Sequence, residues 1–239
     1  MEKRTVEVAA GVRISCQVSG DPAAPSVVLL HALGDRAADW HTVESAFAPH
    51  FHVVALDLRG HGDSDWPGTY SFELMRDDVV AVLDVLNLRD VILVGHSMGG
   101  IVAYLLAQAQ PGRIARLVIE DATPPFPRTR ALPERPAGDL PFDWPVVPAI
   151  AEQVNDPTRR WWTHLPDINS PTLLIGGGPT SHIPQNLLVE VAQLVPDCTL
   201  ITINAGHNIH QAAPDEFLDA LTTWLASHGT VPLPPRTSQ

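Results

Sequence analysis

Short apolar segments alternate with amphipathic ones along most of the chain. Each apolar segment is three or four residues long and rich in branched side chains, which favours a β-strand over a helix. The segments occupy residues 27–30, 53–56, 91–94, 117–119, 173–175 and 200–203. Uninterrupted apolar runs of this kind are typical of parallel strands that are buried on both faces of a sheet.

Helical patterns lie between these segments. Apolar residues recur near a 3.6-residue period in four stretches, residues 71–86, 97–109, 185–194 and 215–226. The alternation of strands with helices predicts an α/β fold with a mostly parallel central sheet flanked by helices. Residues 5–9 and 13–18 alternate apolar with polar side chains instead, and they predict an antiparallel hairpin at the sheet edge.

Residues 122–170 interrupt this alternation. The segment contains ten prolines, which remove helix donors and stiffen the chain. Its large aromatic residues include Phe142, Trp144, Trp161 and Trp162. A long insertion of this kind usually covers a site. We predict a small cap in which these four aromatic side chains line a substrate pocket. The alternative is a surface loop that its tryptophans anchor to the core.

The expected domain organisation follows from this interruption. Residues 1–121 and 171–229 form the α/β core, residues 122–170 form the cap, and residues 230–239 form a loose tail. A total of 239 residues, of which 45% are hydrophobic, suits one globular domain with a large core.

Charge and cysteine usage narrow the class of protein. A net charge of −12 argues against binding to nucleic acid, because phosphate contacts need a basic face. No apolar run approaches the roughly 18 residues that a membrane span needs, and no secretory leader is visible. The two cysteines, Cys16 and Cys198, lie far apart. We therefore expect a cytoplasmic protein with no disulfide and no membrane partner.

A serine lies between two glycines where an apolar run meets a helical stretch. Residues 95–99 read Gly-His-Ser-Met-Gly. The pattern G-x-S-x-G between a strand and a helix is typical of a nucleophile elbow, a tight turn that exposes the serine hydroxyl. Gly95 and Gly99 leave room for that turn. The following helix N-terminus offers free amides to a developing oxyanion, so Ser97 is the candidate nucleophile.

Three further motifs accompany this elbow. Residues 31–35 read HALGD after the first apolar run, residues 57–64 read DLRGHGDS after the second, and residues 206–210 read GHNIH after the last. Together with the elbow, their order and spacing resemble the α/β-hydrolase family over nearly the whole chain.

The resemblance implies an oxyanion hole built from the backbone amides of Leu33 and Met98. Ala32 stands where the family usually has glycine, and alanine tolerates positive φ poorly, so a slightly different turn is expected. The same resemblance implies a bracing role, not a proton-carrying one, for four polar residues of these loops: His31, Asp57, Arg59 and His61.

A serine nucleophile needs a general base, which is usually histidine. Among the 11 histidines, His207 follows the last apolar run in a glycine-containing turn. Loops at the carboxyl ends of parallel strands share one rim, and the family's base occupies this position. His210 is the alternative base. No histidine pair has a carboxylate at zinc-binding spacing on a clear helix, so no metal and no cofactor are expected.

The acid that should orient the base is missing from its usual place. The family most often carries it in the loop after the second-to-last strand, but residues 168–189 contain no Asp or Glu, and Thr180 stands about where it is expected. Some family members take the acid from the end of the strand after the elbow helix, which here is Asp121. Glu120 is the alternative acid and points to the other side of the strand. Loss of the acid is a third possibility.

These residues predict a hydrolase for a small-molecule ester, lactone or thioester. Ser97 forms an acyl-enzyme, His207 acts as the base, and Asp121 orients it. The same triad also serves perhydrolysis, amide hydrolysis and C–C bond hydrolysis. The rival class is a small-molecule-binding protein that uses this fold with little or no catalysis, and the vacant acid loop is its motivation.

Overall fold

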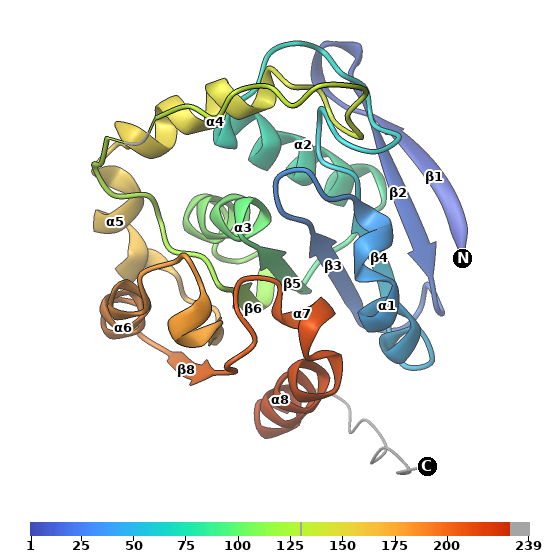
Figure 1. Cartoon of the computed structure of the whole chain (residues 1–239). Helices are drawn as coiled ribbons and strands as arrows, with labels where there is room; N and C mark the ends of the chain where they lie inside the picture. The colour runs from blue at the N-terminus through green and yellow to red at the C-terminus, as the bar shows by residue number, and fades with distance from the viewer. Residues whose placement is uncertain (130, 230–239) are drawn as a thin grey trace.

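A twisted sheet forms the centre of the molecule (Figure 1). The computed structural model describes residues 1–129 and 131–229, and the predicted tail at 230–239 lies outside them. The described strands are β1 (Glu2–Glu7), β2 (Arg13–Ser19), β3 (Ser26–Leu30), β4 (His52–Leu56), β5 (Val91–His96), β6 (Ile114–Glu120), β7 (Thr172–Gly176) and β8 (Cys198–Thr202). Their order is β1-β2-β4-β3-β5-β6-β7-β8, with β3 to β8 parallel.

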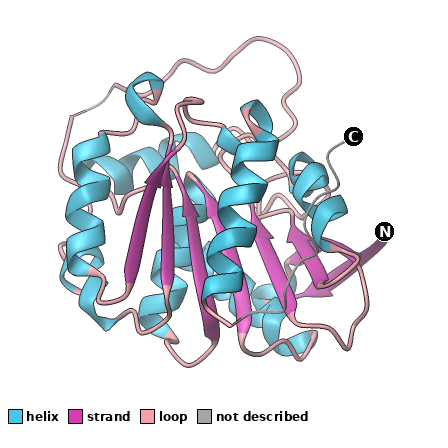
Figure 2. Cartoon of the chain, turned by 90° about the horizontal axis from the view of Figure 1, so that it is seen from below, coloured by secondary structure: helices cyan, strands magenta, loops and turns pink. Residues whose placement is uncertain are grey.

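Helices cover both faces of this sheet (Figure 2). They are α1 (His41–Phe47), α2 (Phe72–Val85), α3 (Met98–Ala109), α4 (Val146–Asn155), α5 (Arg160–Thr163), α6 (Gln185–Leu194), α7 (Ile209–Ala212) and α8 (Pro214–Ser227). The sheet separates two hydrophobic cores: α2, α3 and α6 contribute to one, and α1 and α8 to the other. None of the helices in the described ranges has the length and apolarity needed to cross a membrane.

The predicted fold class is confirmed. Five of the six apolar runs lie within β3 to β7, and the sixth, 200–203, overlaps β8 except for Ile203. β1 and β2 form the predicted antiparallel hairpin at the edge, with β1 ending at Glu7 and not at residue 9. The four helical patterns correspond to α2, α3, α6 and α8. Four shorter helices, α1, α4, α5 and α7, were not predicted. In α4, Pro148 is the third residue, and a helix tolerates proline in its first turn because the amides there have no intrahelical partner.

Polar side chains brace the loops at the carboxyl ends of the strands. The Nε2 atom of His31 accepts a hydrogen bond from the Leu58 amide at 2.9 Å. Asp57 accepts one from the Ala37 amide at 2.8 Å. Arg59 forms a buried ion pair with Asp78, which lies in α2, at 2.5 Å. These contacts match the bracing role that the resemblance implied.

Residues 122–170 are tied to the core beside the start of α2. The Gln153 side chain in α4 accepts a hydrogen bond from the Phe72 amide at 2.9 Å and donates one to Glu73 at 2.6 Å. The Tyr70 hydroxyl donates to the Asp143 carboxylate at 2.5 Å. In Figure 1, α4 lies next to α2. Hydrogen bonds thus hold this segment against the start of α2.

Buried histidines make the stability depend on pH. Burial lowers the pKa of His31 to about 4 and, with His31 nearby, that of His61 to about 3, against an ordinary value of 6.5. Between pH 6.5 and these values the unfolded chain binds more protons than the native one, so stability falls as the pH decreases through this window.

Replacement of one such group tests this dependence. When the pH is lowered from about 7 to about 5, we expect the melting temperature of His61→Asn to fall less than that of the wild type. The reason is that one imidazole that becomes protonated on unfolding has been removed. Thermal unfolding followed by circular dichroism measures the difference. His41→Asn, at an exposed position, is the matched control and should behave as the wild type does. Equal pH dependence in all three proteins contradicts the prediction.

Candidate active site

Ser97 connects β5 to α3 in a strained conformation. Its φ of 50° and ψ of −112° lie outside the regions that non-glycine residues ordinarily occupy. A Cβ atom at Gly95 would collide with the backbone of Gly99, and one at Gly99 would collide with the Leu30 carbonyl. The two glycines therefore permit the turn. Ser97 is half-buried, whereas its immediate neighbours are buried, so the turn exposes the serine.

The two predicted oxyanion-hole amides belong to adjoining turns. The Gly99 amide donates to the His31 carbonyl at 3.1 Å and so ties the elbow to the turn that contains Leu33. Among the hydrogen bonds of the described residues, none has the Leu33 or Met98 amide as its donor. Positive φ in the first turn occurs at Gly34, at 86°, and not at Ala32. The substitution at Ala32 therefore adds no backbone strain.

Asp121 and His207 form a hydrogen-bonded pair. Asp121 Oδ2 lies 2.7 Å from His207 Nδ1. The Asp121 side chain is completely buried, while 19% of the His207 side chain is exposed. Asp121 follows β6 with a φ of 43°, a conformation that aspartate tolerates better than most residues. The sequence placed a carboxylate at this strand end, and the structure brings it to the predicted base.

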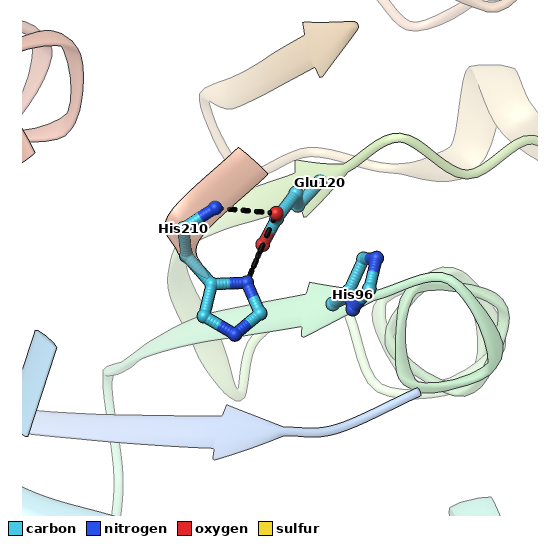
Figure 3. A group of neighbouring side chains, drawn as sticks. All are labelled: His96, Glu120 and His210. Carbon is cyan, nitrogen blue, oxygen red and sulfur yellow. Dashed lines mark hydrogen bonds and ion pairs between the residues drawn. The ribbon is translucent and has the colours of Figure 1, made fainter. Parts of the chain in front are cut away.

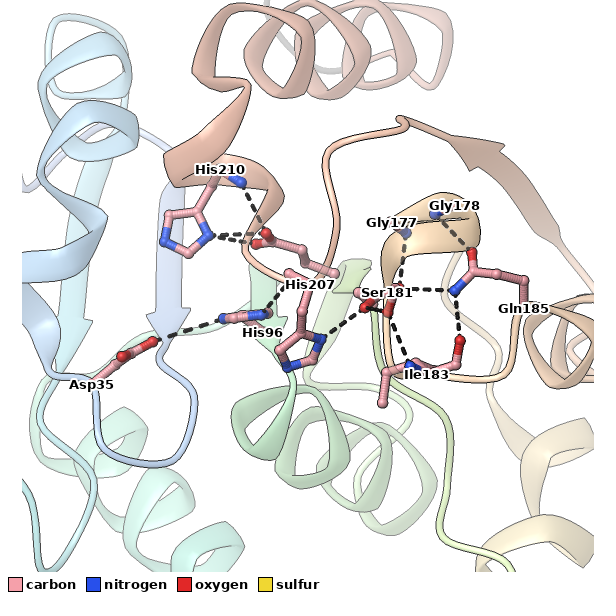
Figure 4. Close-up of polar contacts among 11 residues, drawn as sticks. Asp35, His96, Gly177, Gly178, Ser181, Ile183, Gln185, His207 and His210 are labelled. Atoms are coloured by element: carbon pink, nitrogen blue, oxygen red, sulfur yellow. Dashed lines mark hydrogen bonds and ion pairs between the residues drawn. The ribbon is translucent and has the colours of Figure 1, made fainter. Parts of the chain in front are cut away.

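Four donors surround the Asp121 carboxylate, and Figure 4 labels the four residues that provide them. Besides His207, the Gly177 amide donates at 2.8 Å, the Gln185 side-chain amide at 3.2 Å, and the Ser181 hydroxyl through a short bond. Burial acts to raise the pKa of Asp121, but these hydrogen bonds, led by His207 and Ser181, outweigh it and lower the pKa below its ordinary value. The carboxylate is therefore ionised at neutral pH.

The loop without an acid has a different use in this chain. Instead of a carboxylate, the loop after β7 supplies two of the four donors to Asp121, from Gly177 and Ser181, and the first residue of α6, Gln185, supplies a third. Gly177 also accepts a hydrogen bond from the Gly206 amide at 2.9 Å, and a Cβ on Gly177 would collide with the Gly206 carbonyl. The glycine thus lets the base-bearing turn approach closely. Thr180, at the expected acid position, is exposed.

His207 lies on the same rim as the elbow. Its ring centroid is 4.7 Å from that of His96, the residue before Ser97, and 4.1 Å from that of His182. His182 and Ser97 line one cavity. No hydrogen bond between the Ser97 hydroxyl and His207 is present in the described part of the chain. The hydrogen bond between a catalytic serine and its base is often long until a substrate binds, so this geometry is compatible with Ser97 and His207 acting together.

The alternative acid and the alternative base bind each other. Glu120 Oε2 lies 2.8 Å from His210 Nδ1, and both side chains are buried. Successive strand residues point to opposite faces, so Glu120 and Asp121 meet different histidines. Burial acts to raise the pKa of Glu120, but His96 and His210 outweigh it and lower that pKa.

His96, Glu120 and His210 are the group of metal-ligating side chains found among the described residues. One ligand atom of each lies within 4.8 Å of the others, and all three residues are buried. The spacing of these residues in the sequence did not suggest a cluster.

A cavity of about 420 Å³ opens beside Ser97. Its lining is largely apolar and includes Leu33, Phe72 and Met98 from the core together with Phe126, Ile150 and Val154 from the insertion. Arg128 and Asn155 also contribute to the wall. The insertion therefore provides part of the chamber in front of the candidate nucleophile.

The four aromatic residues predicted to line the pocket are absent from its described lining. Phe142 stacks on His61 at 5.5 Å between ring centroids, and Trp144 lies beside Phe142 at 6.4 Å. Trp161 packs edge-on against Phe72, and the Trp162 indole donates to the Pro125 carbonyl at 2.8 Å. Phe142 and Trp161 pack against His61 and Phe72 of the core, whereas Trp144 and Trp162 contact Phe142 and Pro125 within the insertion itself.

Several residues of the site were not recognised from the sequence. Ser181 and Gln185 belong to the segment 168–189 whose lack of an acid was noted, and their polar side chains there were the available signal. His182, beside His207, and α4, along the cavity, had no signal in the pattern.

Comparison with known proteins agrees with this architecture. The model of the alpha/beta hydrolase fold family matches residues 25–160, which is more than half of the chain. The chain therefore belongs to the alpha/beta hydrolase fold family, and its relatives support hydrolase activity.

Individual relatives include lipases and esterases. The chain is 27% identical to a mouse sn-1-specific diacylglycerol lipase, ABHD11, over 87% of this chain and 83% of the relative. Among solved structures it is similar to Est816, described as an N-acyl homoserine lactone degrading enzyme, with a TM-score of 0.79, 26% identity and coverage of 92% of this chain and 100% of that one. A thermophilic esterase from Thermogutta terrifontis shares the fold at a TM-score of 0.79, with 23% identity and coverage of 96% and 100%.

The donors around Asp121 lead to a prediction about its titration. Removal of the Ser181 hydroxyl in Ser181→Ala should raise the pKa of Asp121, because one hydrogen bond to the ionised form is lost. The stability that this ionised group contributes should then be lost at a higher pH during acidification. A carbon-13 NMR titration of the aspartate carboxyls measures the shift. Ser227→Ala, remote from Asp121 with its hydroxyl on the Trp224 carbonyl, should leave it unchanged. An unaltered pKa in Ser181→Ala contradicts the assignment.

Proposed function

We propose that this protein is a serine hydrolase that cleaves a small ester, lactone or thioester through an acyl-enzyme on Ser97. The observation that carries the proposal is the buried Asp121 carboxylate bonded to His207 at 2.7 Å, on the rim where the elbow exposes Ser97. A carboxylate that orients an imidazole beside an exposed serine is the arrangement that acyl transfer requires.

The proposed reaction has two stages. In the first, His207 takes the Ser97 proton through Nε2 while the serine oxygen attacks the substrate carbonyl. The Leu33 and Met98 amides then stabilise the negative charge that develops on the carbonyl oxygen. His207 returns the proton to the leaving group, and in the second stage it activates water to release the acid. Asp121 stays ionised throughout and stabilises the protonated imidazole.

The rival class of a binding protein rested on the vacant acid loop. Because a carboxylate is hydrogen-bonded to His207 in spite of that vacancy, the argument for an inactive scaffold loses its basis. Perhydrolysis, amide hydrolysis and C–C bond hydrolysis use the same residues, and no observation favours them over ester cleavage. Serine at the nucleophile position disfavours epoxide-hydrolase chemistry, which uses a carboxylate nucleophile in this fold.

The apolar cavity favours a substrate whose acyl group is apolar and binds next to Ser97. Its walls are mostly aliphatic and aromatic side chains, and such surfaces bind hydrocarbon by removing it from water. The names of two relatives, a diacylglycerol lipase and an acyl homoserine lactone degrading enzyme, refer to substrates with an acyl group. These names support an acyl ester or lactone as the substrate of the present chain.

Covalent labelling tests the nucleophile. We expect a fluorophosphonate to add once to the wild-type protein and not to Ser97→Ala, because only an activated serine reacts. Intact-mass spectrometry measures the adduct, and Ser71→Ala, which removes a capping hydroxyl elsewhere, is the control that should still be labelled. Hydrolysis of p-nitrophenyl esters should disappear in the same variant that escapes labelling. Absence of an adduct on folded wild-type protein contradicts the proposed function.

A bulky side chain placed in the cavity tests whether the acyl group of the substrate binds there. Ala151 lines the cavity from α4, so Ala151→Trp should lower kcat/KM for a p-nitrophenyl octanoate by about tenfold or more while changing that for the acetate much less. Glu152→Trp adds the same side chain at an exposed position on the same helix and is the matched control. Steady-state kinetics with both esters measure the ratio. An equal loss for octanoate and acetate places the acyl chain elsewhere.

A further inference from the structure

Glu120 and His210 form a second carboxylate–imidazole pair (Figure 3). One Glu120 oxygen lies 2.8 Å from His210 Nδ1, and the other accepts the His210 backbone amide at 2.9 Å. The two side chains are 0% and 3% exposed. Neither has a step in the proposed reaction. A buried carboxylate is costly unless its partners compensate for lost water, so this pair requires an explanation of its own.

The pair restrains the segment that follows the base. His210 lies three residues after His207, in the short helix α7. Glu120 binds both the main chain and the side chain of His210, and Trp40 stacks on the imidazole with ring centroids 4.1 Å apart. The position and the orientation of His210 are therefore both determined.

His96 restrains the base residue itself. Its Nε2 donates to the His207 backbone carbonyl at 2.9 Å, and its ring contacts the rings of both His207 and His210. Because the partner is a carbonyl, Nε2 must carry the proton. Burial lowers the pKa of His96 to about 4, so the ring is neutral at neutral pH and keeps this single donor.

We propose that Glu120, His210 and His96 are positioning residues that clamp residues 207–210 and thereby hold the His207 ring in line with Ser97. The inference rests on the proposed function. Glu120 and Asp121 are neighbours at the end of β6, so one strand end fixes the base ring through Asp121 and its backbone segment through Glu120. None of the three clamp residues is among the described residues that line the cavity, so the clamp acts on kcat and not on substrate binding.

A divalent metal ion is the competing account of the same cluster. The three side chains place one ligand atom each within 4.8 Å of one another. However, the Glu120 oxygens already accept hydrogen bonds from His210, and His96 Nε2 already donates to a carbonyl. The clamp accounts for these bonds without an ion, whereas the buried His96 Nδ1 and His210 Nε2 have no hydrogen-bond partner among the described residues. The metal content of the purified protein therefore distinguishes the two accounts.

The first test compares two substitutions that each remove one buried charge. Glu120→Gln should lower kcat about 10- to 100-fold and change KM by less than about twofold. The reason is that a small displacement of the His207 ring slows the reaction strongly. Asp78→Asn breaks the buried pair with Arg59 and is the matched control, which should lose melting temperature but keep kcat. Unchanged kcat in Glu120→Gln, with a loss of melting temperature like that of the control, overturns the proposal. The proposal is also overturned if the purified wild type contains one equivalent of a divalent metal and Glu120→Gln contains none.

The second test uses His96 and a conservative variant. His96→Gln retains an amide that can donate to the His207 carbonyl, whereas His96→Leu does not. We expect His96→Gln to keep most of the wild-type kcat and His96→Leu to lose about tenfold or more. Equal kcat in the two variants would contradict the proposed role of His96 as a positioning residue.

Proton NMR separates this proposal from the proposed function. The Nδ1 proton shared by His207 and Asp121 should give a far-downfield signal that disappears in Asp121→Asn. In Glu120→Gln this signal should shift or broaden, and in Asp78→Asn it should not. An unmoved signal in Glu120→Gln overturns the clamp whether or not the protein cleaves esters. If the signal shifts in Glu120→Gln but no fluorophosphonate labels the wild-type protein, the clamp stands and the proposed function fails.

Discussion

The buried Asp121 carboxylate organises the site. It follows β6, receives two donors from the loop after β7 and one from the start of α6, and binds the base in the loop after β8. An ionised carboxylate inside a protein is stable only when hydrogen bonds replace the lost water, and here four donors do so. This requirement draws three loops that are distant in the sequence into one arrangement and places His207 on the rim that carries Ser97.

Backbone conformation is the second constraint on the site. Ser97 and Asp121 both have positive φ, at 50° and 43°, and strain of this kind persists only where the surroundings enforce it. Glycines provide the space: Gly95 and Gly99 for the elbow, and Gly177 for the approach of the base-bearing turn. Positive φ also occurs at Ala10, Asn87 and Asp90, away from the site, so this conformation marks Ser97 and Asp121 only together with their side-chain contacts.

Residues 122–170 use their aromatic side chains in two ways. Trp161 and Phe142 attach the segment to α2 and to the loop around His61, while α4 and Phe126 line the cavity. Large aromatic rings bury more area than other side chains, so they serve attachment well. The remaining residues of the segment then shape the chamber, and this division of labour cannot be read from aromatic content alone.

The sequence by itself determined the α/β fold, the strand set and the elbow, because hydrophobic periodicity and glycine spacing are local properties that a linear pattern records. It also indicated Ser97, His207 and Asp121 as candidates, through the resemblance to a known family. Only the tertiary structure decided which carboxylate meets which histidine, since Glu120 and Asp121 are adjacent in sequence and differ in the face to which they point. The donors Ser181 and Gln185, the clamp at His96 and His210, and the cavity walls likewise depend on contacts between segments far apart in the chain, which no local pattern encodes.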